Sequence, residues 1–107
     1  MPLTTPIDQA EALRDKIADL MPQVRADLEA LVAIPSINFP GYEMSEVLRC
    51  AEAVAELLRK AGAQPQLIPS SSGVPTVRAD VAGPEGAPTV LLYSHYEVQP
   101  AGDESRW

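Results

Sequence analysis

Histidine, cysteine, tryptophan and phenylalanine each occur only once in the 107-residue chain. With Cys50 as the sole cysteine, no intramolecular disulfide can form, and nothing indicates an oxidising compartment. Cations are also few, with 8 Lys and Arg against 15 Asp and Glu, which gives a net charge of −7. Because such a chain is repelled by nucleic acids and anionic membranes, the composition argues against both as partners.

Long apolar runs are missing as well. No stretch approaches the length that spans a bilayer, and residues 1–16 contain neither the basic region nor the apolar region of a signal peptide. A cytoplasmic protein is therefore expected. The hydrophobic fraction of 46% is too high for intrinsic disorder and is typical of a globular domain. The length allows one domain at most, or part of a larger one.

The first half of the chain has the periodicity of two helices. In residues 8–33, apolar side chains recur at three- and four-residue spacing and form one stripe, which predicts an amphipathic helix. Pro22 lies inside this pattern. Because proline removes a backbone donor and clashes with the preceding turn, we expect a kink there or two short helices. Pro35 disfavours helical geometry at Ile34, so the pattern ends there.

The second predicted helix runs from Ser45 to Ala61. Ser45 is the expected N-cap, and Gly62 is the expected residue just after the C-cap. Cys50 shares the apolar face, which predicts a small core residue rather than a reactive thiol. The other residues expected on the buried face are Val47, Ala51, Val54 and Leu58.

From residue 63 onward the period changes to two. Residues 64–68 and 76–81 are predicted strands joined by a turn at 70–73, and a second turn follows at 83–88. Residues 89–93 are then continuously apolar, as in a strand covered on both faces in the middle of a sheet. The predicted fold class is α/β, with two helices followed by three strands. Since a central strand needs neighbours on both sides, the sheet is expected to be incomplete.

The only histidine, His95, follows the predicted central strand. Ligands bind at the carboxyl edge of α/β sheets, and a neutral imidazole there suits a metal ion. Glu97 lies two residues further on, so in extended backbone its carboxylate faces the same way and can orient the ring. The alternative is an ordinary packed or hydrogen-bonded histidine, with Glu97, Asp103 and Glu104 as solvated loop acids. The spacing alone leaves both interpretations open.

Residues 90–107, VLLYSHYEVQPAGDESRW, resemble the first metal-binding signature of a zinc-dependent metallopeptidase family. That family includes dipeptidases, carnosinase, aminoacylases and acetylornithine deacetylases. Its signature is an apolar strand, then Gly-His-x-Asp-Val, then a proline, a glycine and a tryptophan. Residues 28–37 resemble the family's first helix and turn, and residues 51–63 its second helix. The positions that match the signature are Ser94, His95, Tyr96, Glu97, Val98, Pro100, Gly102 and Trp107.

The resemblance implies that residues 1–107 form the N-terminal portion of a zinc-exopeptidase-like catalytic domain. Family members hydrolyse the amide bond of dipeptides or N-acyl amino acids with two zinc ions, and they often dimerise through a lid domain, which this portion lacks. Only His95 carries over as a metal ligand. Glu97 stands in the place of the aspartate that orients the histidine, and its extra methylene is expected to tilt the ring. Ser94 replaces the common glycine, which is a mild departure.

The resemblance also implies that this portion is inactive alone. A catalytic zinc site needs about three protein donors and a water, so one histidine is not expected to retain zinc. Two other interpretations remain. In one of them, the chain is a non-enzymatic α/β module that pairs with a partner chain through its exposed sheet edge. In the other, it is a complete small domain with an unrelated function.

Overall fold

The computed structural model describes residues 6–107. The chain forms two compact units, with the boundary between residues 30 and 31. The first unit consists of most of helix α1 (Pro6–Ala33). This helix confirms the prediction for residues 8–33. Pro22 lies inside it, and the helix continues on both sides, so of the two alternatives the division into two short helices is wrong, and a kink at Pro22 stays a prediction. The cost of the proline is one missing intrahelical hydrogen bond, because it has no N–H to donate to Ala18.

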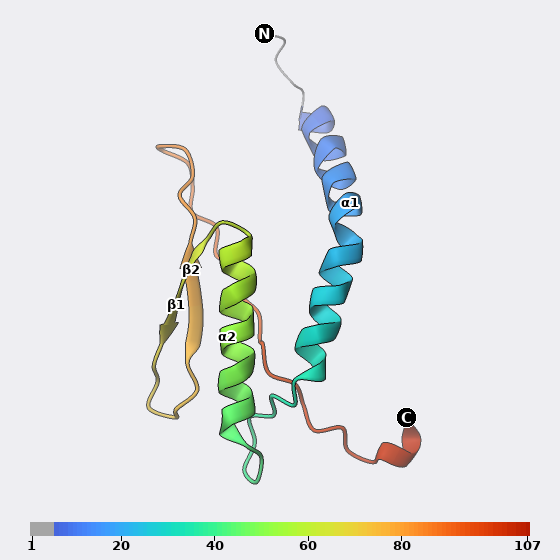
Figure 1. Cartoon of the computed structure of the whole chain (residues 1–107). Coiled ribbons are helices and arrows are strands. Elements are labelled where there is room, and N and C mark those ends of the chain that lie inside the picture. The colour runs from blue at the N-terminus through green and yellow to red at the C-terminus, as the bar shows by residue number, and fades with distance from the viewer. Residues whose placement is uncertain (1–5) are drawn as a thin grey trace. The chain divides into compact units, whose positions relative to one another are not determined.

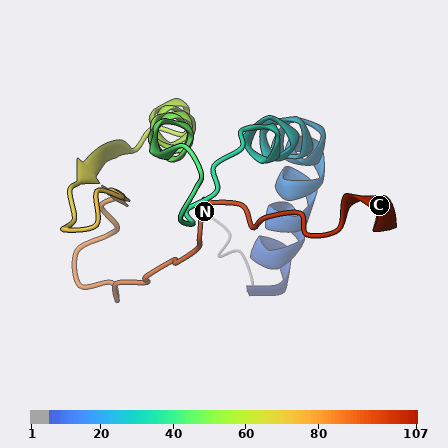
Figure 2. The ribbon, with the colours of Figure 1, turned by 90° about the horizontal axis from the view of Figure 1, so that it is seen from below.

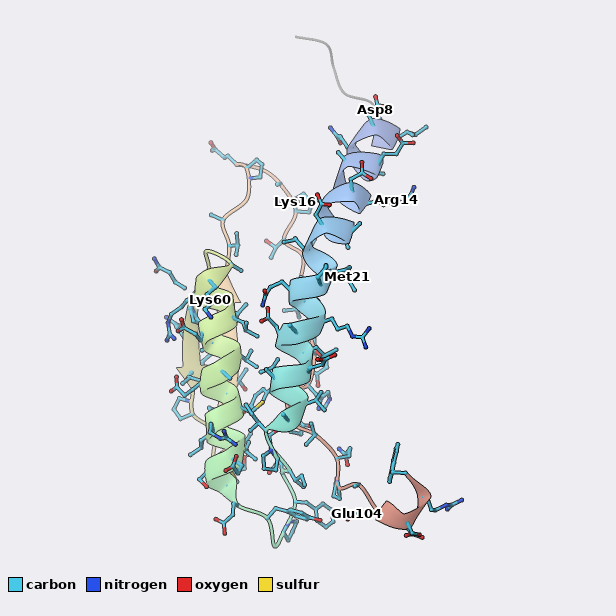
Figure 3. All side chains as sticks on the ribbon, turned by 45° about the vertical axis from the view of Figure 1, so that its right-hand side comes forward. Asp8, Arg14, Lys16, Met21, Lys60 and Glu104 are labelled. Atoms are coloured by element: carbon cyan, nitrogen blue, oxygen red, sulfur yellow. The ribbon has the colours of Figure 1, made fainter. Side chains whose placement is uncertain are left out.

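The apolar stripe of α1 is not covered. No described residue of the helix is buried. Figure 3 shows the side chains projecting from the helix on different sides, with Arg14, Lys16 and Met21 labelled. The exposed members of the predicted stripe are Leu13, Ile17, Leu20, Met21, Val24 and Leu28. In residues 6–107, no helix is long and apolar enough to cross a bilayer.

The second helix, α2 (Met44–Lys60), begins one residue earlier than predicted. Its N-cap is Glu43 in extended conformation, without a side-chain capping bond, so the prediction of Ser45 as the N-cap is wrong. Ser45 already lies in the first turn and is itself helical. At the other end, Gly62 takes the predicted place after the C-cap with φ of +93°. Its N–H and that of Ala63 donate to the carbonyls of Arg59 and Leu58, the paired bonds that close a Schellman motif.

The small core lies on one face of α2. Strands β1 (Gln64–Ile68) and β2 (Thr76–Asp80) form an antiparallel hairpin against this helix, as Figure 1 shows. Both strands and the turn between them agree with the sequence prediction. In the hairpin register, half-buried Leu67 pairs with Val77 and Pro65 with Ala79, which places all four on the same face. The fully buried hydrophobic residues are Val47, Cys50, Ala51 and Ala55, whereas Val54 and Leu58 are only half-buried.

The predicted third strand does not form. Residues 89–93 have no regular secondary structure, and the side chains of Val90 to Tyr93 are 76–88% exposed. Figure 2 shows this stretch as a bare trace that leaves the hairpin. A strand exists only through backbone bonds to a neighbour, and the one described sheet contains β1 and β2 alone. The prediction of a covered central strand is therefore wrong for these residues, while the α/β class of two helices followed by strands is confirmed.

The left-handed conformation at Gly62 leads to a first prediction. Replacing Gly62 with alanine places a Cβ at φ of +93°, where nothing lies within 4 Å, so the cost is conformational rather than steric contact with neighbours. We expect the G62A variant to lose about 1 kcal/mol of unfolding free energy, measured by urea denaturation. G83A is the matched control, because Gly83 has no positive φ and its added Cβ meets only Ala87 at 4.0 Å. Equal stability of G62A and the wild type would contradict the left-handed cap.

The exposed segment 89–93 leads to a second prediction. Exposed apolar residues outside any sheet promote self-association, so the average mass of the isolated chain should rise with concentration. A charge at the 88%-exposed Leu91, introduced by L91K, should reduce this association in sedimentation experiments. S71K adds the same charge in the exposed hairpin turn and should leave it unchanged. A wild-type chain that stays monomeric at every concentration would show that residues 89–93 do not promote self-association.

Candidate functional site

The side chains of His95 and Glu97 meet, as their spacing predicts. The ring Nδ1 of His95 lies 2.7 Å from Oε1 of Glu97. The side chain of His95 is 68% exposed, whereas that of Glu97 is 23% exposed. The extra methylene of Glu97, compared with aspartate, therefore does not prevent contact with the ring. Glu97 is also more than a solvated loop acid, since its carboxylate is engaged by the only imidazole of the chain.

The chemistry of the partners assigns the proton on the neutral ring. An ionised carboxylate can only accept hydrogen bonds, so Nδ1 must donate to Glu97 and carry the hydrogen. Nε2 is then the unprotonated nitrogen, and the Tyr93 hydroxyl, 3.1 Å away, is placed to donate to it. The rings of Tyr93 and His95 meet edge to face, with centroids 5.6 Å apart. The pair thus makes Nε2 the acceptor nitrogen of the ring, which is the atom that can take a proton or bind a metal ion once the Tyr93 hydroxyl leaves it.

Hydrogen bonding determines the acidity of Glu97. The bond from the His95 ring is the largest influence that lowers the pKa of this carboxyl below its ordinary value of 4.5. A backbone hydrogen bond adds to the effect, and partial burial opposes it. The carboxylate is therefore held in its charged, accepting form, which is the form that the assigned ring tautomer requires.

The residue between the pair faces the other way. The Tyr96 hydroxyl donates to the carbonyl of Pro75 at 2.6 Å, and the Tyr96 carbonyl accepts from the thiol of Cys50 at 3.3 Å. Burial, the largest cause, raises the pKa of Tyr96 above its ordinary value of 10.0, so the phenol remains a donor. Cys50 is fully buried, which confirms it as a core residue. Its contact with the Tyr96 carbonyl was missed by the sequence reasoning, because spacing along α2 says nothing of distant loops.

A third bond holds the same stretch one residue further on. The N–H of Val98 donates to the carbonyl of Ser36 at 3.0 Å. Ser36 is fully buried, and its hydroxyl has no partner within the described residues. The loop that follows Pro35 therefore lies against the stretch that carries His95, although the two are far apart in sequence.

The remaining acids of the segment serve local structure. Asp103 accepts from the backbone N–H and the hydroxyl of Ser105, and these bonds lower its pKa while capping the short 3₁₀ helix η1 (Glu104–Arg106). The indole N–H of Trp107 donates to the carbonyl of Ala101 at 3.1 Å. These contacts stay within residues 101–107, so the structure shows no contact between Asp103 and His95.

The described residues do not complete a metal site. Between residues 6 and 107, no three or more His, Cys, Asp or Glu side chains are grouped to hold a metal ion. A catalytic zinc requires about three protein donors. His95 fits such a site as one imidazole ligand with its orienting carboxylate, and the other donors are absent from this part of the chain.

No family model and no solved structure matches this chain. It is 31% identical over 104 residues to the Cys-Gly metallodipeptidase DUG1 of Saccharomyces cerevisiae. The match covers 86% of this chain but 22% of the yeast protein, so the chain spans about a fifth of that relative's length. This similarity supports a metallopeptidase-like relation.

The lowered pKa of Glu97 predicts how the pair responds to pH. A carboxyl whose pKa is depressed by folding contributes stability above its unfolded value, here 4.5, and loses it as pH falls through the folded value. E97Q should therefore be less stable than the wild type at pH 7, by less than about 1 kcal/mol since the ring is exposed. The difference should vanish at the acid end of a urea denaturation series. A stability difference independent of pH would contradict the ionised hydrogen bond.

Proposed function

We propose that this chain is the N-terminal part of the catalytic domain of a metal-dependent dipeptidase, in which His95 binds metal through Nε2. The observation that carries the proposal is the 2.7 Å bond between Nδ1 and Glu97, because it leaves Nε2 as the exposed acceptor. The match to a Cys-Gly metallodipeptidase supports the class of reaction. The substrates proposed are dipeptides or N-acyl amino acids, cleaved at the amide bond.

The roles of the residues follow from their contacts. Glu97 holds the proton on Nδ1, fixes the ring orientation and increases the basicity of Nε2, which are the effects of a carboxylate behind a metal-bound histidine. The Tyr93 hydroxyl is placed to donate to Nε2, so it would have to leave that nitrogen for His95 to hold a metal ion there. Two zinc ions, as in the resembled family, supply the polarisation of the scissile carbonyl and the acidification of the attacking water.

The proposed activity requires donors that residues 6–107 do not bring together. His95 is one ligand where about three are needed. The uncovered side chains of Val90 to Tyr93, directly before the histidine, fit the same proposal, because further strands of a catalytic sheet would cover them. We therefore propose that the described part is inactive alone.

A second candidate function is a non-enzymatic module that pairs with a partner chain. The exposed, apolar segment 89–93, which is not part of the described sheet, favours it, since such a segment can add to the sheet of another protein. The two candidates differ at His95. Strand pairing requires the backbone and the apolar side chains of 89–93, whereas the dipeptidase requires Nε2.

A chimera tests the proposed function. Residues 1–107 replace the matching part of the yeast metallodipeptidase, and hydrolysis of Cys-Gly is measured with added zinc. We expect activity in the chimera, no detectable activity in H95A, and about a 10- to 100-fold reduction in E97Q, the usual cost of losing a carboxylate behind a metal-bound histidine. E104Q is the matched control, because it neutralises an exposed acid in the same segment.

The fold of each chimera is checked by circular dichroism and thermal melting. A folded chimera that lacks activity, or one whose activity survives H95A, would contradict the proposal. Activity lost equally in H95A and E104Q would also count against it, because it would reflect general damage to the segment.

A further inference from the structure

Residues 95–98, the stretch that carries His95, form hydrogen bonds to three separate parts of the structure. The thiol of Cys50 on α2 donates to the Tyr96 carbonyl, and the Tyr96 hydroxyl donates to the Pro75 carbonyl just before β2. In the third hydrogen bond, the Val98 N–H donates to the Ser36 carbonyl. Two of these three bonds therefore belong to Tyr96, one from its backbone and one from its side chain.

The side chains of residues 95–97 make contacts in two different places. The Tyr96 side chain is half-buried toward Pro75, while the His95 ring and the Glu97 carboxylate contact each other and lie outside the core.

We propose that Tyr96 is a positioning residue for His95: its anchored carbonyl and hydroxyl fix the backbone so that the Glu97 carboxylate meets Nδ1 and leaves Nε2 facing outward. This proposal rests on the proposed function in that a metal ligand needs one tautomer and one ring orientation. The 2.7 Å contact between the pair joins two exposed or half-exposed side chains. Such a pair keeps a single geometry only if the backbone beneath it does not rotate.

The environment of Tyr96 suits this role. A buried phenol that donates to a backbone carbonyl stays protonated, and burial raises its pKa accordingly. Phenylalanine at position 96 would remove the hydroxyl donor and leave the Pro75 carbonyl without this hydrogen bond.

The experiment is nitrogen NMR of the His95 ring in the chain itself, at a pH where the imidazole is neutral. In the wild type we expect separate signals for a protonated Nδ1 and an unprotonated Nε2. In Y96F the two signals should move toward each other, corresponding to a fall of about threefold or more in the tautomer ratio, within the range that one net hydrogen bond controls. E97A provides the reference for loss of the contribution of Glu97, while the Tyr93 hydroxyl still favours an unprotonated Nε2.

Two controls separate positioning from general destabilisation. Y42F removes a hydroxyl from the 48%-exposed Tyr42 and should leave the ring signals unchanged. G62A lowers the stability at the distant end of α2 and should also leave them unchanged. If Y96F does not fold, the test uses C50A, which removes the hydrogen bond from residue 50 to the Tyr96 carbonyl. The C50S variant keeps a donor at residue 50 and should restore the tautomer ratio of the wild type.

Unchanged ring signals in folded Y96F would overturn the positioning role, as would an equal shift in G62A. The NMR measurement needs neither metal nor substrate, so its outcome is independent of the chimera assay. An active chimera with unchanged Y96F signals would reject the positioning role and leave the dipeptidase proposal standing. An inactive, folded chimera with shifted Y96F signals would reject the dipeptidase proposal alone.

Discussion

The geometry around His95 depends on the hydrogen bonds that hold residue 96. The Cys50 thiol donates to the Tyr96 carbonyl, and the Tyr96 hydroxyl donates to the Pro75 carbonyl. The His95–Glu97 bond joins the two side chains on either side of this held residue. A short piece of chain therefore presents one oriented imidazole even though its own sheet has only two strands.

The same features explain why the described residues present one oriented imidazole but no group of metal-binding side chains. The buried hydrophobic core consists of four small or medium residues on one face of α2. It does not extend to the segment 89–93, whose side chains remain exposed. An oriented imidazole beside an uncovered apolar segment fits the proposed part of a catalytic domain, and the chain spans about a fifth of the length of the yeast metallodipeptidase that it matches.

The sequence predicted those features that depend on neighbours close along the chain. The helices, the hairpin and the Gly62 cap follow from local periodicity and from the one residue type that tolerates positive φ, and the contact of Glu97 with His95 follows from a two-residue spacing. The predictions failed where distant partners decide. The apolar run at 89–93 was interpreted as a covered strand, but a strand needs a neighbour that the described residues do not supply. The hydrogen bonds of Ser36 and Cys50 to residues 98 and 96 join positions far apart in sequence, and such contacts leave no periodic pattern in the sequence.

Zinc-edge anomalous scattering from crystals of the metallodipeptidase chimera tests whether His95 binds metal through Nε2. We expect an anomalous peak about 2.0–2.1 Å from Nε2 of His95, the usual distance of an imidazole ligand, with Nδ1 still bonded to Glu97. Zinc in the crystal with none of it within bonding distance of His95, or zinc bound at Nδ1 with Glu97 displaced, would contradict the proposal.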